Sequence, residues 1–390
     1  TGVGINMHNY RFLVDNRVFS QLRIRGTWGE TGKVNYPPFA ARHTYTVQAG
    51  AWHTTGMGAT LTYMGNEDLS WEKTSTLNLG LDMTLFKRYT LNLSWYDKIT
   101  NDLITDVSIV PSSGFTSYKD NMGKVRNRGV EVNLNVNAIQ KQDWGLNVFF
   151  RASHNKNRIM EISDALKEYN QKVDDYYSKY PNYNKPLLKY TEGASLTSIY
   201  AVRSLGISPA NGQEVFLDAN GKVTYDWNAT NQVVVGNTEP KLQGSFGFNF
   251  RWKRWTLFTA ALFETGGDLY NSTLVDNVEC ADIWKSNVDK RVYTQRWLEP
   301  GDVAPLKSIK DRYQVTRPTS RFVQKNRLVN CNSLSLGYKF DPHLINRIGF
   351  SRMKLQLNMN EIAYTSSVKR ERGLSYPFAR TFNFTLNATF

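Results

Sequence analysis

The chain has 390 residues, of which 41% are hydrophobic and 13% aromatic, and its formal net charge is +14 at pH 7. Its mean hydropathy is -0.48, and no stretch approaches the ~18 consecutive apolar residues of a spanning helix, so the sequence excludes a helical membrane protein. A transmembrane β-barrel stays open, because lumen-facing polar residues lower the hydropathy of each strand. The positive charge favours an anionic partner. The basic residues stand singly and form no zinc-finger or helix-turn-helix signature, so we expect contacts with anionic lipid headgroups and no nucleic-acid binding.

The first residues and the two cysteines bear on the cellular compartment. The opening TGVGINMHNYRFL has neither the basic nor the apolar segment of a signal peptide. If the protein is exported, we therefore expect these residues to be a downstream part of a longer chain. Cys280 and Cys331 lack metal-ligand spacing, and the sequence leaves open whether they pair in an oxidising compartment or stay free.

Alternating apolar and polar residues predict a first strand near residues 20–29, with Leu22 and Ile24 on the face opposite Arg23. Residues 30–70 predict a long loop that contains a short strand pair in HTYTVQAG and GATLTYM. The alternation in this first strand predicts a sheet with one apolar and one polar face.

The alternation then becomes regular in successive strand pairs. TSTLNLGLDMTL returns through a tight turn at residues 86–89, RGVEVNLNVNA through residues 140–143, and GSFGFNFRW through residues 253–254. A moderate turn at residues 341–350 precedes the last two strands. In all, the patterns predict ten strands, near residues 20–29, 72–86, 90–107, 121–139, 144–160, 240–252, 255–264, 328–341, 351–362 and 377–390.

The long connection before Pro240 contains two further predicted elements. Ile159, Ile162, Leu166 and Tyr169 have the spacing of an amphipathic helix. EVFLDANGKVTYDW predicts a β-hairpin that turns at Asn220-Gly221. This connection is therefore expected to be folded.

The terminal strand alternates for about thirteen residues, whereas soluble strands usually stop at about five or six and a bilayer-crossing strand needs roughly 9–11. Its apolar positions run from Phe378 through Phe384 to the last residue, Phe390. Many bacterial outer-membrane barrels end on an aromatic residue, so we predict that Phe390 serves in membrane insertion.

Long and short connections also alternate along the chain, as expected of an up-and-down barrel with short periplasmic turns and long external loops. Aromatic residues gather at the strand ends, as in interfacial girdles. They are Phe86, Tyr89, Trp144, Trp252, Trp255, Tyr338 and Phe340 at the short turns, and Trp28, Trp71 and Phe378 at the long loops. We therefore predict an all-β, antiparallel, transmembrane up-and-down β-barrel with long extracellular loops. A closed ten-stranded barrel fits the count, but the abrupt start before the first strand favours half of a wider barrel.

Several segments carry a family resemblance. They are LRIRGTWGETG (22–32), LSWEKTSTLNLGLDM (69–83), WYDKITNDLI (95–104), NMGKVRNRGVEVNLNV (121–136), GNTEPKLQGSFGFNF (236–250), RWLEPGD (296–302), LSLGYKF (334–340) and YPFARTFNFTLNATF (376–390). In order and spacing they resemble the C-terminal barrel half of the SusC/RagA class of TonB-dependent outer-membrane transporters. NMNEIAYTSSVKRERGL (358–374) departs from that class, which tends to carry an Asn-Leu pair and a longer acidic loop there.

The resemblance implies that residues 1–390 are about half of a 22-stranded barrel, and that the plug and N-terminal extension are absent. It implies import of a glycan or peptide oligomer, powered through a TonB complex that contacts the missing N-terminal part. It also implies a SusD-like surface lipoprotein as a lid and outer-membrane lipid around the barrel.

No enzymatic chemistry is expected. The five histidines are scattered, and Asp218-Ala-Asn-Gly221 lacks the later ligands of a calcium loop and predicts a turn. We expect no catalytic, metal or cofactor site and assign no ligand-binding residue. The loop aromatics that offer faces for a sugar, but that suit loop packing or lid contact equally, are Trp52, Tyr176, Tyr177, Tyr180, Trp227 and Trp284.

Two alternatives remain at this point. One is a passive porin or adhesin barrel, and the other is a soluble, β-rich carbohydrate-binding protein. The soluble alternative requires Leu79, Val132 and Phe384 to be buried between two packed layers.

Overall fold

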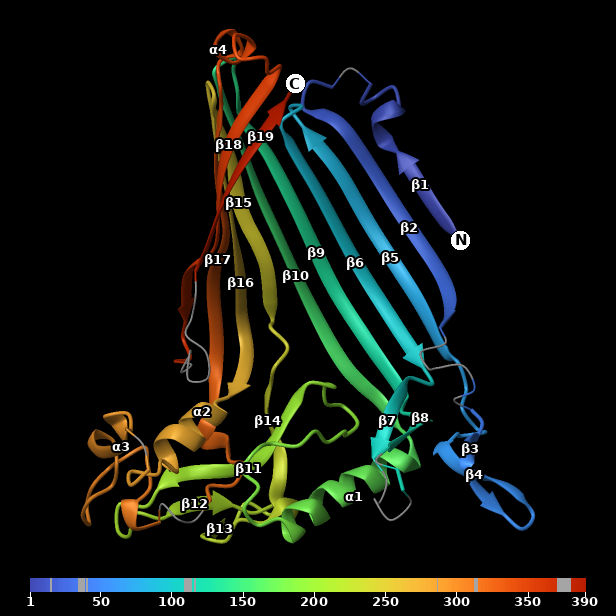
Figure 1. Ribbon diagram of the computed structural model, residues 1–390, viewed down its shortest axis with the longest axis vertical. Coiled ribbons are helices and arrows are strands. Elements are labelled where there is room, and N and C mark those ends of the chain that lie inside the picture. The colour runs from blue at the N-terminus through green and yellow to red at the C-terminus, as the bar shows by residue number, and fades with distance from the viewer. Residues whose placement is uncertain are drawn as a thin grey trace.

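The computed structural model describes residues 1–14, 16–33, 39, 41–108, 114–115, 117–285, 287–311, 315–369 and 380–390. In these residues the long strands form one eleven-stranded antiparallel sheet, in the order β1-β2-β5-β6-β9-β10-β15-β16-β17-β18-β19 (Figure 1). Their bounds are β1 (Gly2–Asn6), β2 (Phe19–Lys33), β5 (Glu72–Leu85), β6 (Tyr89–Asn101), β9 (Gly123–Gln140), β10 (Trp144–Ile162), β15 (Leu242–Trp252), β16 (Trp255–Tyr270), β17 (Val323–Lys339), β18 (Arg352–Ser366) and β19 (Thr381–Thr389).

The sheet is an up-and-down meander, which we call the barrel wall. Each strand pairs with the next wall strand along the chain, and the longest, β10, has 19 residues. The edges are β1 and β19, and within the described part of the chain neither pairs with another strand on its outer side. The barrel wall is therefore open, as the half-barrel prediction requires.

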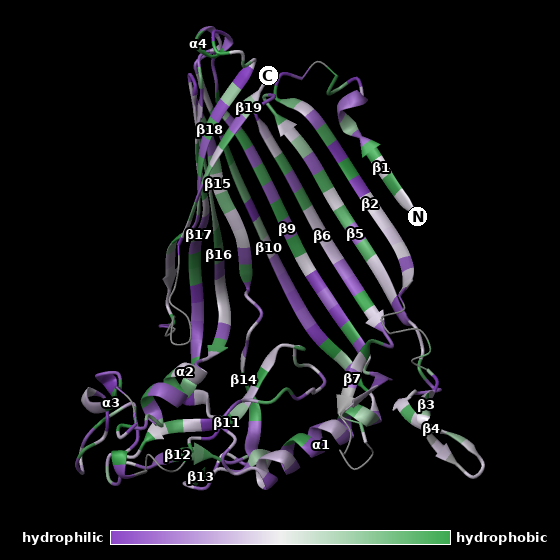
Figure 2. Cartoon of the chain, in the orientation of Figure 1, coloured by the Kyte–Doolittle hydropathy of each residue, from purple (hydrophilic) through white to green (hydrophobic). Residues whose placement is uncertain are grey.

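The two faces of the barrel wall differ as the alternation predicted. Leu79 is 50% exposed and Phe384 75% exposed, and Val132 is half-buried. Figure 2 shows apolar and polar residues alternating along the strands. None of the three apolar side chains is enclosed between packed layers, so the burial that a soluble sandwich requires is absent. The predicted all-β barrel class is confirmed.

Short turns close one end of the barrel wall. Phe86 and Lys87 both have positive φ, 50° and 56°, the conformation of a type I′ hairpin turn whose twist matches that of the flanking strands. Asp341 caps the short helix α4 (Pro342–Asn346) in the turn before β18, accepting a hydrogen bond from the His343 amide. The C-terminus lies at this same end (Figure 1).

All ten predicted strands are present, with two corrections. β1 was not predicted, because GVGIN is short and contains two glycines that interrupt the alternation. β6 ends at Asn101, since Asp102 turns the chain with φ 55°, and the expected extension to Val107 is a separate strand, β7 (Ile104–Ser108), paired with β8 (Ser117–Asn121). Phe378 and the start of the predicted last strand lie outside the described residues.

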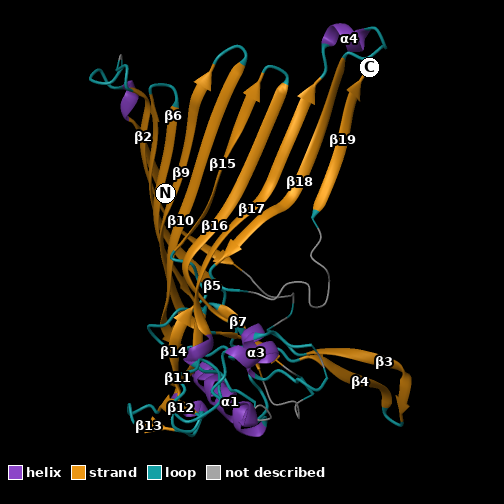
Figure 3. Ribbon diagram, turned by 90° about the vertical axis from the view of Figure 1, so that its left-hand side faces the viewer, coloured by secondary structure: helices purple, strands orange, loops and turns teal. Residues whose placement is uncertain are grey.

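At the opposite end the long connections fold into smaller elements (Figure 3). The hairpin β3 (Thr44–His53) and β4 (Gly56–Tyr63) confirms the predicted strand pair. The strands β11 (Ser198–Ile207), β12 (Glu214–Leu217), β13 (Val223–Thr224) and β14 (Gln232–Asn237) form a second, four-stranded sheet, and the β12–β13 hairpin is the one predicted at Asn220-Gly221. The helices there are α1 (Asp164–Lys179), α2 (Ser272–Leu274), α3 (Arg291–Thr294) and the π-helix η4 (Val275–Glu279). Single 3-10 turns at this end are η3 (Ala229–Asn231), η5 (Ile309–Asp311) and η6 (Ser320–Phe322), whereas η1 (Met7–Asn9) lies between β1 and β2 at the short-turn end (Figure 1).

We call α1, β11 to β14 and residues 271–322 the loop platform. It has its own buried clusters, one around Val173, Tyr177 and Ala229 and another around Val278 and Leu306. The platform is therefore a packed unit at the end of the barrel wall opposite the short turns, and not a set of free loops (Figure 1).

The predicted amphipathic helix begins later than expected. Ile159 and Ile162 belong to β10, and α1 starts after Ser163, whose side chain caps the helix by accepting from the Leu166 amide. The cause is that β10 stays paired with β9 up to Ile162, which carries the apolar spacing into a strand. In the described residues no helix has the length and hydropathy to cross a membrane.

Candidate functional site

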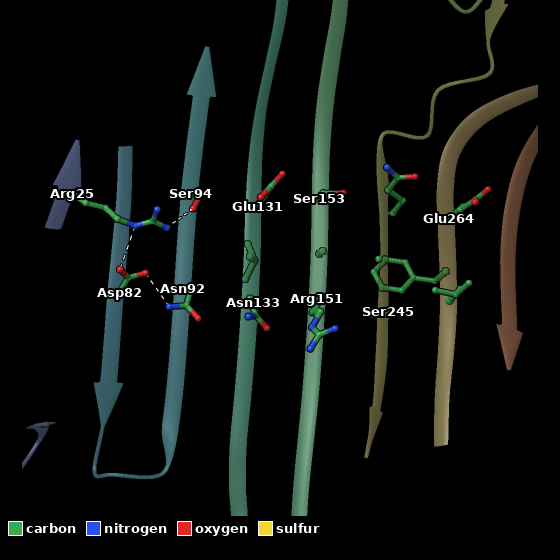
Figure 4. A pocket seen from close by; sticks show the side chains of 16 residues that line it. Arg25, Asp82, Asn92, Ser94, Glu131, Asn133, Arg151, Ser153, Ser245 and Glu264 are labelled. Carbon is green, nitrogen blue, oxygen red and sulfur yellow. Dashed lines mark hydrogen bonds and ion pairs between the residues drawn. The ribbon is translucent and has the colours of Figure 1, made fainter. Parts of the chain in front are cut away.

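The concave face of the barrel wall holds a polar hollow of about 590 Å³ that crosses seven strands from β2 to β16. Strand alternation aims amides, hydroxyls and charges into it, while most of the apolar residues of the same strands face the other way. Figure 4 shows the lining side chains. Its polar members are Arg25, Asp82, Asn92, Ser94, Glu131, Asn133, Arg151, Ser153, Gln243, Ser245 and Glu264.

One side of the hollow is organised by an ion pair. Arg25 Nε lies 3.2 Å from Asp82 Oδ2, and the Arg25 guanidinium also donates to Ser94 Oγ at 3.1 Å. Asn92 Nδ2 donates to Asp82 Oδ1 at 2.9 Å. These bonds fix the direction of a donor and an acceptor on neighbouring strands. Because the Arg25 side chain is 41% exposed, the pair contributes little to stability and can exchange partners with a ligand.

An aromatic pair lies on the same face. The rings of Phe149 and Phe258 stack with centroids 6.3 Å apart, and Arg151 lies over the Phe149 ring at 5.4 Å. An apolar face among hydrogen-bonding groups suits both a sugar ring and a peptide, since each presents apolar and polar surface together. The sequence patterns did not single out these residues, because their proximity depends on strand register.

The predicted loop aromatics divide into two groups. Trp52 and Trp284 are largely exposed, and Tyr176 and Tyr180 are exposed with their centroids 4.5 Å apart. Tyr177 is buried in the platform. The first group presents rings at the surface, so it remains available for contact.

Tyr177 and Trp227 have structural partners. The Tyr177 hydroxyl donates to the Lys185 carbonyl and accepts from the Leu187 amide, and burial raises the pKa of Tyr177 to about 12. Trp227 Nε1 donates to the Pro318 carbonyl, and its ring contacts Tyr177 and the Arg317 guanidinium. For these two rings, packing of the loops is the function that the structure shows.

The girdle at the short turns is present. Trp144 pairs with Trp252 at 5.7 Å between centroids, and Trp255 with Tyr338 at 4.7 Å. Phe390 follows β19, is 88% exposed and contacts Phe350 in a tilted arrangement with ring centroids 4.6 Å apart. Its role in membrane insertion stays a prediction.

A buried charge cluster in the platform was missed by the sequence patterns. Arg321 donates to Glu214 Oε2 and to Glu279 Oε1, each at 2.7 Å, and Glu279 is completely buried. The three residues come from η6, from β12 and from the π-helix, so no local pattern could have grouped them. The cluster joins the strand layer of the platform to its helical part.

Other candidate chemistry has structural explanations. Asp218 Oδ1 accepts from the amides of Asn220 and Lys222, which is the predicted turn. Cys280, in the platform, and Cys331, on β17, are both free thiols. In the described ranges no group of three or more His, Cys, Asp and Glu residues has the arrangement of a metal site.

Comparison with known proteins identifies this barrel wall. The family described as "TonB dependent receptor-like, beta-barrel" matches residues 8–360. The chain belongs to this family. The match confirms the predicted resemblance and the location in the bacterial outer membrane, and it excludes the soluble alternative.

Individual relatives agree with the family. TonB-dependent receptor P39 of Formosa agariphila is 24% identical over 92% of this chain, and TonB-dependent receptor SusC of Bacteroides thetaiotaomicron is 26% identical over 64% of it. The RagAB peptide importer in its "open-open" state has the same fold, with a TM-score of 0.77 at 20% identity over 100% of this chain. The chain spans 38% of the P39 receptor and 42% of the RagAB chain.

Proposed function

We propose that this chain is the C-terminal part of the barrel of a SusC/RagA-type importer that moves a polar oligomer, a glycan or a peptide, across the outer membrane. The remaining strands, the plug and the TonB-contacting segment belong to the rest of the protein. The open edges at β1 and β19 and the share of the relatives that the chain spans both support this placement.

The observation that carries the proposal is the polar hollow on the concave face. The concave face is kept hydrated by the charges of Arg25 and Asp82 and by the side-chain amides of Asn92 and Asn133. The opposite face of the same strands is apolar. A cargo rich in hydroxyl or amide groups can replace its hydrogen bonds to water with hydrogen bonds to this face as it passes. Its polar groups therefore keep a hydrogen-bonding partner throughout.

A SusD-like surface lipoprotein is the proposed partner at the loop end. The support is the likeness to SusC and to the RagAB importer, together with a platform that presents Trp284 and Tyr180 at its surface. Energy would come from the TonB complex. The proposal contains no covalent step and hence no enzyme activity.

Uptake by cells tests the proposed function. Cells that express the full-length protein are given fluorescent oligosaccharides or fluorescent peptides, with TonB active or inactivated. We expect one cargo class to accumulate only with active TonB, and a surface lipoprotein to copurify. Accumulation that ignores TonB, with open-channel conductance and no lipoprotein, would instead support the passive porin.

Within that experiment, the double variant Arg25→Gln/Asp82→Asn tests the hollow. It removes both charges and keeps the size of the side chains, so the barrel should assemble normally. We expect uptake to fall roughly tenfold, the equivalent of about 1.4 kcal/mol of cargo binding. Unchanged uptake would place cargo contact elsewhere on the wall.

A further inference from the structure

A group of basic residues lies on the lipid-facing side of the barrel wall, near its loop end. Arg126 and Arg128 on β9 alternate with the residues that line the polar hollow and share a face with Val130 and Val132. On β10, Lys156 pairs with Arg128 and Arg158 with Arg126. We call these four residues the basic patch.

The spacing in the basic patch is set by the sheet. Directly opposed side chains on antiparallel strands have Cβ atoms about 4.5–5.5 Å apart, and successive residues on one face are about 7 Å apart along the strand. The four cations therefore lie close enough together to surround one phosphate group.

The patch carries more positive charge than its protein neighbours neutralise. Asp97 on β6 binds Arg126 at 2.5 Å and 2.8 Å and Arg128 at 3.1 Å. Lys156 and Arg158 are exposed and form no ion pair or hydrogen bond with any other described residue. Because like charges opposite one another destabilise a sheet, an anion is needed to balance them.

The height of the patch matches the outer membrane interface. Lys156 lies twelve residues beyond Trp144, the girdle residue at the start of β10. At about 3.4 Å per residue and a tilt of about 45°, this is roughly 29 Å along the membrane normal, just above an apolar band about 25 Å tall.

A second residue marks the same level. Trp28 is paired with Leu77, Leu77 with Asp97, and Asp97 with Arg128, so the four lie in one row across the strands. Trp28 is 58% exposed on the lipid-facing side, as expected of an aromatic at the headgroups. The next rows toward the short turns are apolar, with Trp95 opposite Val130 and Leu93 opposite Val132.

We propose that the basic patch binds the phosphate of a lipid headgroup in the outer leaflet. Arg128, Lys156 and Arg158 hold the phosphate oxygens, Asp97 orients Arg126 and Arg128, and the acyl chains lie along Val130, Val132 and Trp95. The inference follows from the outer-membrane location and does not depend on the cargo.

Native mass spectrometry of the detergent-extracted full-length protein tests this site. The probes are dioctanoyl phosphatidic acid, dioctanoylglycerol, which lacks phosphate, and inorganic phosphate. We expect the wild-type protein to bind phosphatidic acid and not dioctanoylglycerol. Inorganic phosphate at the same concentration should not displace the lipid, and displacement would overturn the lipid as the source of the phosphate.

Variants separate the patch from general charge effects. Lys156→Gln/Arg158→Gln should weaken phosphatidic acid binding roughly 30-fold, since each cation near a headgroup contributes about 1 kcal/mol, or about fivefold. Lys98→Gln is the matched control, because Lys98 is exposed at the same height on the opposite, concave face.

Two outcomes would overturn the proposal: binding by the Gln pair as tight as wild type, or an equal loss in the Lys98 variant. Heat-modifiable gel mobility checks that each barrel folds. The charge-retaining pair Lys156→Arg/Arg158→Lys keeps the test decisive if the Gln pair fails to assemble, since it should bind within about threefold of wild type, and loss of binding there would also overturn the proposal.

Discussion

The stability of the loop platform depends on a buried cluster of three charged residues. Arg321 lies between Glu214 and Glu279, and all three side chains are at most 10% exposed. Burial alone lowers the pKa of Arg321, but the two carboxylates outweigh it and raise the pKa above its ordinary value, so the residue stays charged. The cluster is therefore stable only with its cation in place.

Replacing that cation should loosen the platform and leave the barrel intact. Arg321→Met leaves two buried carboxylates without a partner, which costs about 3–5 kcal/mol of local stability. We expect faster hydrogen exchange in β12 and the π-helix, with no change in β9. Lys167→Met is the control, because Lys167 forms an exposed pair with Asp164, and we expect no change in hydrogen exchange in β12 or the π-helix. Equal effects of the two variants would contradict this role.

The ionisation of Tyr177 limits the stability of the platform at alkaline pH. Burial raises its pKa to about 12 from an ordinary value of 10.0, so the unfolded chain loses this proton first as the pH rises. Its stabilisation is therefore complete below pH 10 and declines between pH 10 and 12. Tyrosinate absorbance should show one fewer late-titrating group in Tyr177→Phe than in the wild type, in which burial also raises the pKa of Tyr118 to about 12. That variant should also lose about 1–3 kcal/mol, because the Leu187 amide keeps no acceptor. An equal number of late-titrating groups in the wild type and in Tyr177→Phe would contradict the prediction.

Among the strands and helices, those whose formation depends on the local residue pattern were predicted from the sequence. β9 could be predicted because Val130, Val132 and Leu134 repeat every second residue. The α1 boundary could not, since Ile162 fits both periods and only its pairing with Gly123 decides for a strand. Of the four-stranded platform sheet only the β12–β13 hairpin was predicted, because the pairing of β11 with β14 joins segments that no local turn connects, such as Ser198 with Asn237. The polar hollow depended on register in the same way.

Neighbouring residues on β9 test which face meets lipid. Val132 is on the apolar face and Asn133 lines the hollow. Val132→Arg should destabilise the assembled protein by about 1–3 kcal/mol, because it places a charge inside the apolar band, between the bilayer midplane and the outer interface. Asn133→Arg enters water and should change stability by no more than about 0.5 kcal/mol. Urea unfolding in lipid vesicles, followed by tryptophan fluorescence, measures both, and a reversed order would invert the assigned faces.

For the whole molecule, the two unpaired edges of the sheet are the main free-energy cost of placing the barrel wall in a bilayer. A backbone N–H or C=O that finds no partner in hydrocarbon costs several kcal/mol, so only a closed barrel is stable in a bilayer. The edges at β1 and β19 are unpaired on their outer sides within the described residues. The barrel wall therefore needs further strands, and the proposed source is the rest of the same protein.

Hydrogen exchange along β19 tests this closure. In an antiparallel pair, alternate amides of Thr381–Thr389 point toward β18 and the others point away. In the full-length protein both sets should be protected, because a further strand covers the outer edge. β10, covered by β9 and β15 on either side, should be slow as well and serves as the control. Fast outward amides in the full-length protein would show that β19 is a true edge, and closure of the wall against the rest of the protein would then be wrong.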